Sequence, residues 1–231
     1  MALSLSLDPF LPNKMSLLRS IRMIFPEWKE DNVLPAGLSH VETSGNAAIT
    51  SYTWSGSNIR RARLCELDVP GKFTAETIVI YPDSSTMTPI FGTEYISIAN
   101  KKFFGAIDFH PLAQDELYLK TYIDEYLYDF PARSVEDSKF YDLSTYFSSK
   151  FWIKKSEVDF REEYIDWVDR YMSRYRAALE GGESWFDSRQ AHTNYDRHMA
   201  EKDPAHGILK SYFSAEFADF YVQKFLFDES A

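Results

Sequence analysis

The chain has 231 residues, of which 45% are hydrophobic and 16% aromatic, and its formal net charge is −10 at pH 7. This size is enough for one substantial hydrophobic core, so we expect a single domain over residues 1–231, and the acidic balance argues against a general nucleic-acid binder, which needs clustered Lys and Arg. The single cysteine, Cys65, excludes a disulfide within the chain and any iron–sulfur cluster or structural zinc site held by several cysteines.

The N-terminal part of the chain predicts one helix and no targeting signal. Apolar residues recur at helical spacing between residues 12 and 26, and Pro26 is expected to end that helix. Residues 1–20 lack the charged start and apolar core of a secretory signal, and no segment of the sequence is long and apolar enough to span a membrane. These features predict a soluble intracellular protein that does not bind membranes.

The middle of the chain predicts five β-strands. Their short connections favour an antiparallel meander. Phe103 and Ile107 lie on the strand face opposite Phe104, so bulky apolar residues occupy both faces of the sheet, and helices must cover both. The predicted strands span residues 46–54, 59–68, 73–81, 90–99 and 101–110.

Three more helices are available to cover this sheet. They are predicted over residues 113–130, over residues 160–182, where Gly181 is expected to cap the end, and over residues 204–225. Residues 146–155 could add one more strand. The predicted fold class is therefore α+β, a three-layer α/β/α sandwich with a central antiparallel β-sheet.

Glu94 is the first candidate for chemistry, and it lies in the strand IFGTEYISIAN, residues 90–100. Strand alternation places Glu94 on the same face as Ile90, Ile96 and Ile98. A carboxylate there either faces water or an ion-pair partner, which is the commoner arrangement, or it lines an apolar pocket. In such a pocket the loss of hydration raises the pKa of the carboxyl and keeps it protonated.

Familiar catalytic motifs are absent from the sequence, which contains no Gly-rich nucleotide-binding loop, no HExxH zinc motif and no GxSxG nucleophile elbow. His192 and His198 are six residues apart and lie on different faces of any helix, so we expect surface or hydrogen-bonded histidines at both positions. Asp203 precedes Pro204, a pair that most often marks a helix N-cap followed by the first helical residue.

Several strings, taken together in their order and spacing, resemble the ferredoxin-dependent bilin reductases, enzymes that reduce the open-chain tetrapyrrole biliverdin. Within this family, the strings DFHPLAQDELYL and DPAHG look most like the branch that converts biliverdin to 15,16-dihydrobiliverdin on the way to phycoerythrobilin. The strings that carry the resemblance are IYPDSSTMTPIFGTEYISI, GAIDFHPLAQDELYL, YFSS and EKDPAHGILKSYFSAEFADFYVQKFLFD.

The resemblance implies an α/β/α sandwich that holds the pigment between the sheet and the C-terminal helices. It assigns the proton chemistry to two acids, which correspond here to Glu94 and Asp203. Single electrons are expected from a reduced ferredoxin carrying a 2Fe-2S cluster, with no cofactor bound in the protein itself. The implied substrate-binding residues are Thr77, Phe91, Ser148 and Lys154, of which Lys154 is the expected partner of a substrate propionate.

The sequence departs from the family pattern at two positions. Most members have Asp where Glu94 stands, so the carboxyl here extends one methylene further, and displacements of that size can be costly in catalysis. Thr77 occupies the position of a catalytic His in the branch that makes phycocyanobilin. The absence of that His argues against phycocyanobilin formation.

Other functions remain open at this stage. One is the four-electron reduction of biliverdin to phycoerythrobilin, another is a relative acting on chlorophyll catabolites, and a third is a bilin carrier or lyase without reductase activity.

The expected partners are biliverdin and ferredoxin, with the next bilin reductase of the pathway as a further candidate, and the expected compartment is the cytoplasm or the plastid stroma. Candidate basic residues for docking an acidic ferredoxin are Arg60, Arg63, Lys101, Lys102 and Lys155.

Overall fold

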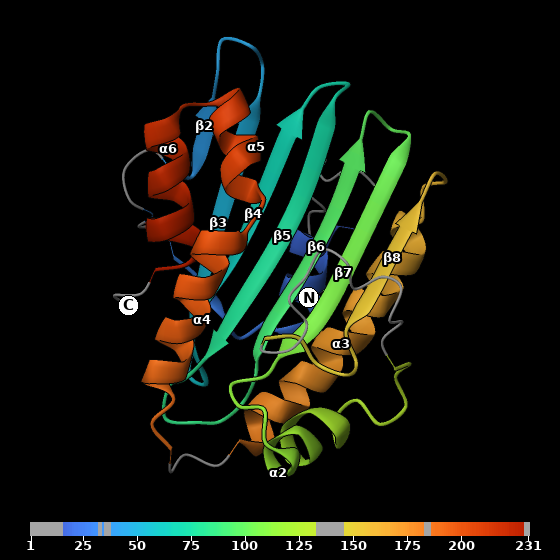
Figure 1. The fold of residues 1–231 in the computed structure, drawn as a ribbon, viewed down its shortest axis with the longest axis vertical. Coiled ribbons are helices and arrows are strands. Elements are labelled where there is room, and N and C mark those ends of the chain that lie inside the picture. Colours follow the sequence, from blue (N-terminus) through green and yellow to red (C-terminus); the bar gives the residue numbers. More distant parts are fainter. Residues whose placement is uncertain (1–15, 32–33, 35–37, 133–145, 183–185, 229–231) are drawn as a thin grey trace, which may run out of the picture.

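One eight-stranded sheet forms the centre of the computed structural model, which describes residues 16–31, 34, 38–132, 146–182 and 186–228 (Figure 1). The strand order is β1-β3-β4-β5-β6-β7-β8, with β2 also paired to β3, and all pairings are antiparallel. The strands are β1 (Lys29–Glu30), β2 (His40–Glu42), β3 (Ala48–Gly56), β4 (Ile59–Val69), β5 (Phe73–Pro82), β6 (Ile90–Ile98), β7 (Lys102–His110) and β8 (Trp152–Ser156).

The predicted antiparallel meander is confirmed, because strands β3 to β7 coincide with the five predicted strands within a few residues. The additional strand considered in residues 146–155 is present as β8 and pairs with β7. Strands β1 and β2 were not predicted, since segments of two and three residues are too short to show an alternating pattern.

Helices α1 (Leu17–Ile24) and α3 (Arg161–Gly181) cover one face of the sheet. Helix α1 begins at Ser16, whose hydroxyl accepts a hydrogen bond from the Arg19 N–H, as expected of an N-cap residue. Tyr164, Tyr171 and Tyr175 of α3 are fully buried against the strands. The helix predicted from residue 12 is confirmed over α1, and its first residues lie outside the described part of the chain.

The opposite face carries the C-terminal helices, so the predicted three-layer α+β sandwich is confirmed (Figure 1). In the view of Figure 1 helix α4 and the helices that follow it lie in front of the sheet and α3 lies behind it. These elements are α4 (Arg189–Lys202), α5 (Ala205–Tyr212), α6 (Ala215–Phe220) and the π-helical turn η3 (Tyr221–Leu226); α2 (Glu116–Leu119) and the turn η1 (Lys120–Asp124) lie at one end of the sheet.

Several predicted helix boundaries were wrong. The C-terminal helix predicted over residues 204–225 is interrupted at Phe213, and Ser214 starts α6 by accepting a hydrogen bond from the Phe217 N–H. Gly181 does not cap α3; it is the last helical residue, and Gly182 after it has an extended conformation with φ −65°. The helix predicted over residues 113–130 is reduced to α2 and η1.

Helix α4 was not predicted at all. Its buried residues are His192, Tyr195 and Asp196, so the inner face of the helix carries polar groups where a hydrophobicity pattern requires apolar ones. Among the described residues, no helix is long and apolar enough to cross a membrane. A single domain over residues 1–231 stays a prediction, because that range includes residues outside the description.

Candidate active site

A cleft lies between the sheet and the end of α4, and two cavities meet in it at Glu94. The outer cavity has a volume of about 620 Å³ and the inner one about 90 Å³. Ligand pockets typically measure about 300–1,000 Å³, so the outer cavity alone falls within the range for a small organic molecule. Glu94 lines both cavities, Asp203 lines the inner one and Pro204 the outer one.

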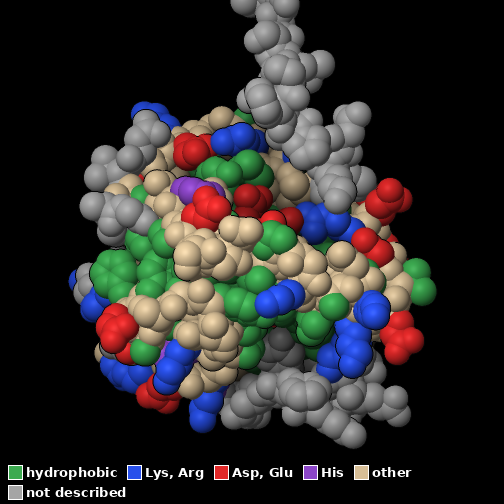
Figure 2. Space-filling model, turned by 90° about the horizontal axis from the view of Figure 1, so that it is seen from above, with side chains coloured by type: hydrophobic (Ala, Val, Ile, Leu, Met, Phe, Trp, Pro, Cys, Tyr) green, Lys and Arg blue, Asp and Glu red, His purple; other side chains and the backbone are tan. Residues whose placement is uncertain are grey.

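The outer cavity has a largely apolar lining that also includes two lysines and, besides Glu94, the acid Glu157. Ile96, Ile98 and Phe104 project from β6 and β7, while Lys102 and Lys155 come from β7 and β8. Figure 2 shows the end of the molecule at the top of Figure 1, where hydrophobic side chains gather and Lys and Arg side chains lie among and beside them. Such a surface suits a flat apolar ligand with anionic substituents.

Glu94 enters the cleft because β6 alternates. Thr93 and Tyr95 point toward α3, so Glu94 faces the C-terminal helices. Burial and, to a smaller extent, the negative charge of Asp203 raise the pKa of Glu94, the hydrogen bond from Thr77 Oγ1 to Glu94 Oε1 (3.4 Å) opposes this rise, and the resulting pKa is about 8. Glu94 therefore holds its proton at neutral pH. This is the behaviour expected of a carboxyl that lines an apolar pocket and does not face water or an ion-pair partner.

Asp203 approaches the same cavity from the helical layer. It ends α4, and its Oδ1 accepts a hydrogen bond from the Ala205 N–H at 2.7 Å. Burial raises the pKa of Asp203 to about 6, and the hydrogen bond from Ala205 opposes this rise. The predicted N-cap is wrong in detail, because Pro204 precedes α5 and Asp203 is the C-cap of α4. The fold thus brings Glu94 and Asp203, from separate layers, to one cavity.

The inner cavity has a polar wall that sequence reasoning missed. Asp108 and His110 both face it from β7, because they share strand parity with Ala106. Ser148 lines neither cavity; its N–H donates to Asp108 Oδ2 at 2.7 Å and its hydroxyl donates to Asp108 Oδ1. Ser148 therefore holds Asp108 in this structure, and its role as a substrate contact stays a prediction. The sequence did carry a signal for this wall, because strand alternation in the string DFH places Asp108 and His110 on the same face.

Two residues predicted to contact substrate lie on the face of the sheet opposite the cleft. Phe91 is fully buried on the α3 side, packed against Phe109 and Tyr175. The Lys154 ammonium pairs with Glu163 of α3 and lines a hollow on that side, whereas its neighbour Lys155 lines the outer cavity. Thr77, in contrast, is where it was expected, in the wall of the inner cavity beside Glu94.

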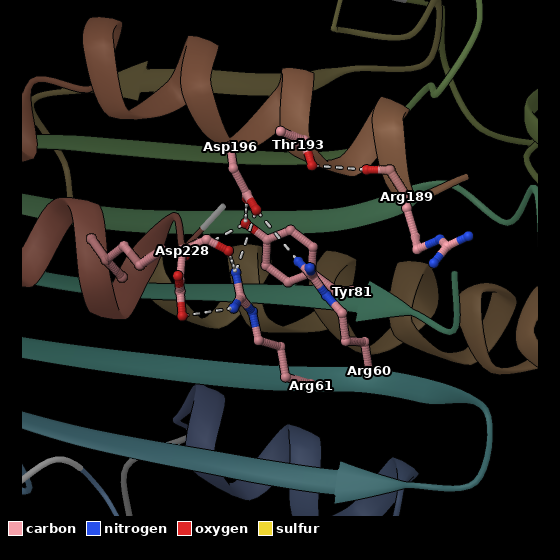
Figure 3. Close-up of polar contacts among 8 residues, drawn as sticks. Arg60, Arg61, Tyr81, Arg189, Thr193, Asp196 and Asp228 are labelled. Carbon is pink, nitrogen blue, oxygen red and sulfur yellow. Dashed lines mark hydrogen bonds and ion pairs between the residues drawn. The ribbon is translucent and has the colours of Figure 1, made fainter. Parts of the chain in front are cut away.

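A buried ionic cluster fixes α4 on the sheet (Figure 3). Asp196 is completely buried and accepts a hydrogen bond from the Tyr81 hydroxyl, and it pairs with Arg60 at 3.4 Å and Arg61 at 3.5 Å. Arg61 also reaches Asp228 at 3.8 Å. Because Asp196 lies between Tyr195 and Asp203 in the sequence, this cluster positions the helix that roofs the inner cavity.

Several of the other basic and histidine candidates lie between the sheet and the C-terminal helices. Arg60 is bound by Asp196 and Arg63 lies over the Phe225 ring, so neither is an exposed docking residue for ferredoxin. His192 is buried, and neither of its ring nitrogens has a hydrogen-bond partner among the described residues, which contradicts the prediction of a surface or satisfied histidine. The His198 ring contacts Tyr146. Across the described ranges, no three His, Cys, Asp or Glu side chains form a metal-binding group.

The sequence and the fold can be compared with those of known proteins. A family model described as ferredoxin-dependent bilin reductase matches residues 27–228. Proteins named 15,16-dihydrobiliverdin:ferredoxin oxidoreductase from Gloeobacter violaceus (29% identity, 85% of this chain and 86% of the relative) and Prochlorococcus marinus (30% identity, 87% of each) are similar in sequence. A crystal structure of phytochromobilin synthase from tomato in complex with biliverdin has a TM-score of 0.74 at 17% identity, covering 92% of this chain and 81% of that one, which shows a common fold.

Proposed function

Because the chain belongs to the ferredoxin-dependent bilin reductase family, we propose that it catalyses the two-electron reduction of biliverdin to 15,16-dihydrobiliverdin, with ferredoxin as the electron donor. The reaction adds two electrons and two protons, and the C15=C16 double bond becomes a single bond. The observation that supports this function best is a pair of carboxyl groups with raised pKa, Glu94 and Asp203, in the wall of one cleft.

Each electron that enters the conjugated system makes the pigment more basic, so the protein must provide protons. A Glu with its ordinary pKa is protonated in only about one molecule in five hundred at pH 7, whereas a Glu with a pKa of about 8 is protonated in about nine of ten. Glu94 is therefore poised as an acid, and we assign the second proton to Asp203. Proton placement by the two layers then selects the carbons that are reduced.

The propionates of biliverdin need cationic partners, and we assign this role to Lys155 and Lys102, which line the outer cavity, because Lys154 pairs with Glu163 on the other face of the sheet. We expect the double substitution Lys102→Met and Lys155→Met to raise the KM for biliverdin about three- to tenfold with little change in kcat at saturating ferredoxin, because each exposed ion pair contributes up to about 1 kcal/mol. Lys154→Met on the opposite face is the matched control and should leave KM unchanged. Equal effects of Lys154→Met and of the double substitution would contradict this assignment.

The electron donor is expected to dock at the same end of the molecule. An acidic ferredoxin requires positive charge near the exposed edge of the pigment, and Lys101, Lys102 and Lys155 lie at the β6–β7 turn and on the neighbouring edge strand. No cofactor within the chain is needed for this step if single electrons pass from the ferredoxin cluster to the bound pigment. The next bilin reductase of the pathway stays a predicted further partner.

The rate of reduction should fall as pH rises through about 8. The protonated Glu94 is the donor, its folded-state pKa is raised to about 8, and above that value the proton has been lost. Single-turnover reduction measured from about pH 7 to about pH 9, with biliverdin affinity measured alongside, tests this. A rate that stays constant over this range while affinity is also constant would exclude Glu94 as the pH-limiting donor.

The proposed function is tested by an anaerobic assay with biliverdin, ferredoxin and a ferredoxin-reducing system, with absorption spectra and chromatographic identification of the product. Formation of 15,16-dihydrobiliverdin as the end product supports the proposal. Phycoerythrobilin as the end product would instead show four-electron reduction. A bound pigment whose spectrum does not change on reduction of ferredoxin would indicate a bilin carrier.

A further inference from the structure

The imidazole of His110 lies at the inner end of the cleft, directly above β6. The residue is only 7% exposed, and its ring is enclosed by Phe147 at 5.1 Å and Tyr195 at 5.2 Å between ring centroids. A Cβ atom on Gly92 would lie 2.2 Å from His110 Nε2, so the glycine is what allows the ring to approach the strand this closely. His110 nevertheless lines the inner cavity.

The hydrogen-bond partners of this ring determine its tautomer. Nδ1 lies 3.0 Å from the backbone carbonyl oxygen of Tyr146, which can only accept, so Nδ1 carries the hydrogen. Asp108 Oδ2 lies 3.7 Å from the same nitrogen, which is too far for a hydrogen bond, but its negative charge also favours a hydrogen on Nδ1. Burial lowers the pKa of His110 to about 4, and the ring is neutral. Nε2 is therefore left without a hydrogen and acts as an acceptor.

The orientation of the ring is supported from behind. The side chain of Asp108 is completely buried, and it accepts hydrogen bonds from the N–H and the hydroxyl of Ser148. Each of its two oxygens accepts a hydrogen bond from Ser148, and His110 Nε2 is a further acceptor in this wall. A donor N–H that was buried in the inner cavity without reaching an acceptor would lose its hydrogen bonds to water, which is unfavourable by about 1–3 kcal/mol.

We propose that His110 is a positioning residue whose Nε2 accepts a hydrogen bond from a ring N–H of the bound tetrapyrrole and so determines how deeply the pigment enters the cleft. The inference rests on the proposed function, because it takes a bilin as the ligand. Gly92, over which the ring lies, is two residues from Glu94, a distance of about 7 Å along a strand. The depth of the pigment therefore decides which carbon lies at the Glu94 carboxyl.

The test combines nitrogen NMR of histidine-labelled protein with two variants. In the free wild-type protein, Nδ1 of His110 should show the resonance of a protonated nitrogen and Nε2 that of an unprotonated one, and biliverdin should shift the Nε2 resonance in the direction of an accepted hydrogen bond. His110→Leu should weaken biliverdin binding about tenfold, which corresponds to the loss of one hydrogen bond, while His110→Gln, whose amide oxygen can replace Nε2, should recover most of the affinity. His110→Leu should also change the ratio of reduction products. If the midpoint of thermal unfolding is unchanged, a purely structural role of His110 would not explain such a change.

The results separate this inference from the proposed function. If wild-type protein neither binds nor reduces biliverdin, the proposed function fails. The tautomer of His110 can still be tested in that case, because NMR measures it on the free protein. If wild-type protein reduces biliverdin, but the Nε2 resonance does not respond to the pigment or His110→Leu binds as tightly as wild type, the role of His110 is overturned. Should His110→Leu fail to fold, the NMR titration of the wild-type protein decides.

Discussion

Glu94→Gln is expected to lower the rate of biliverdin reduction by about 10²–10⁴-fold, the range typical for loss of a general acid, while biliverdin binding changes little. The amide has the shape of the carboxylic acid and can still accept the hydrogen bond from Thr77, but it has no acidic proton to transfer. The pigment should therefore accept an electron and stop at a radical, which absorption and electron paramagnetic resonance spectra would detect after one-electron reduction.

Glu66→Gln is a matched control for this result. Glu66 is also a largely buried glutamate of the same sheet, with its pKa raised to about 7 by burial and by the charge of Glu76, yet it lines neither cavity of the cleft. Its substitution should leave turnover at the wild-type level. Wild-type turnover by Glu94→Gln, or an equal loss in both variants, would show that Glu94 is not the proton donor.

Asp196→Asn should lower the free energy of unfolding by about 3 kcal/mol, the lower end of the range for breaking a buried ion pair. The substitution keeps the shape of the side chain and removes the charge that compensates Arg60 and Arg61, although Asp228 still lies 3.8 Å from Arg61, which limits the loss. Chemical denaturation followed by circular dichroism measures the effect.

Asp187→Asn provides the comparison, because it removes an equivalent charge from the pair with Arg189 on the protein surface. That substitution should leave the denaturation midpoint unchanged, since exposed ion pairs contribute little to stability. Equal midpoints for Asp196→Asn and wild type would mean that the cluster of Figure 3 does not stabilise the packing of α4. A loss of stability in Asp196→Asn should also weaken biliverdin binding, because α4 carries Tyr195 and ends at Asp203.

The sequence alone was sufficient for strands β3 to β7 and for the face of β6 on which Glu94 lies. Alternation with a period of two is a local property of an extended chain, so it placed Glu94 on the face of Ile96 and Ile98 before any partner strand was known. The order of the motifs indicated the family, and the matching family model confirms it. Helix α4 escaped detection because the groups on its inner face, such as Asp196, are paired with residues distant in the sequence.

Only the tertiary structure decided which polar residues face the cleft. Lys154 and Lys155 are adjacent, and a shift of one residue exchanges the two faces of a strand, so their roles depend on the register in which Ile153 pairs with Ala106. The meeting of Glu94 with Asp203, and the tautomer of His110, likewise depend on contacts between segments far apart in the chain. Local periodicity determines which residues share a face, whereas packing between layers determines what that face meets.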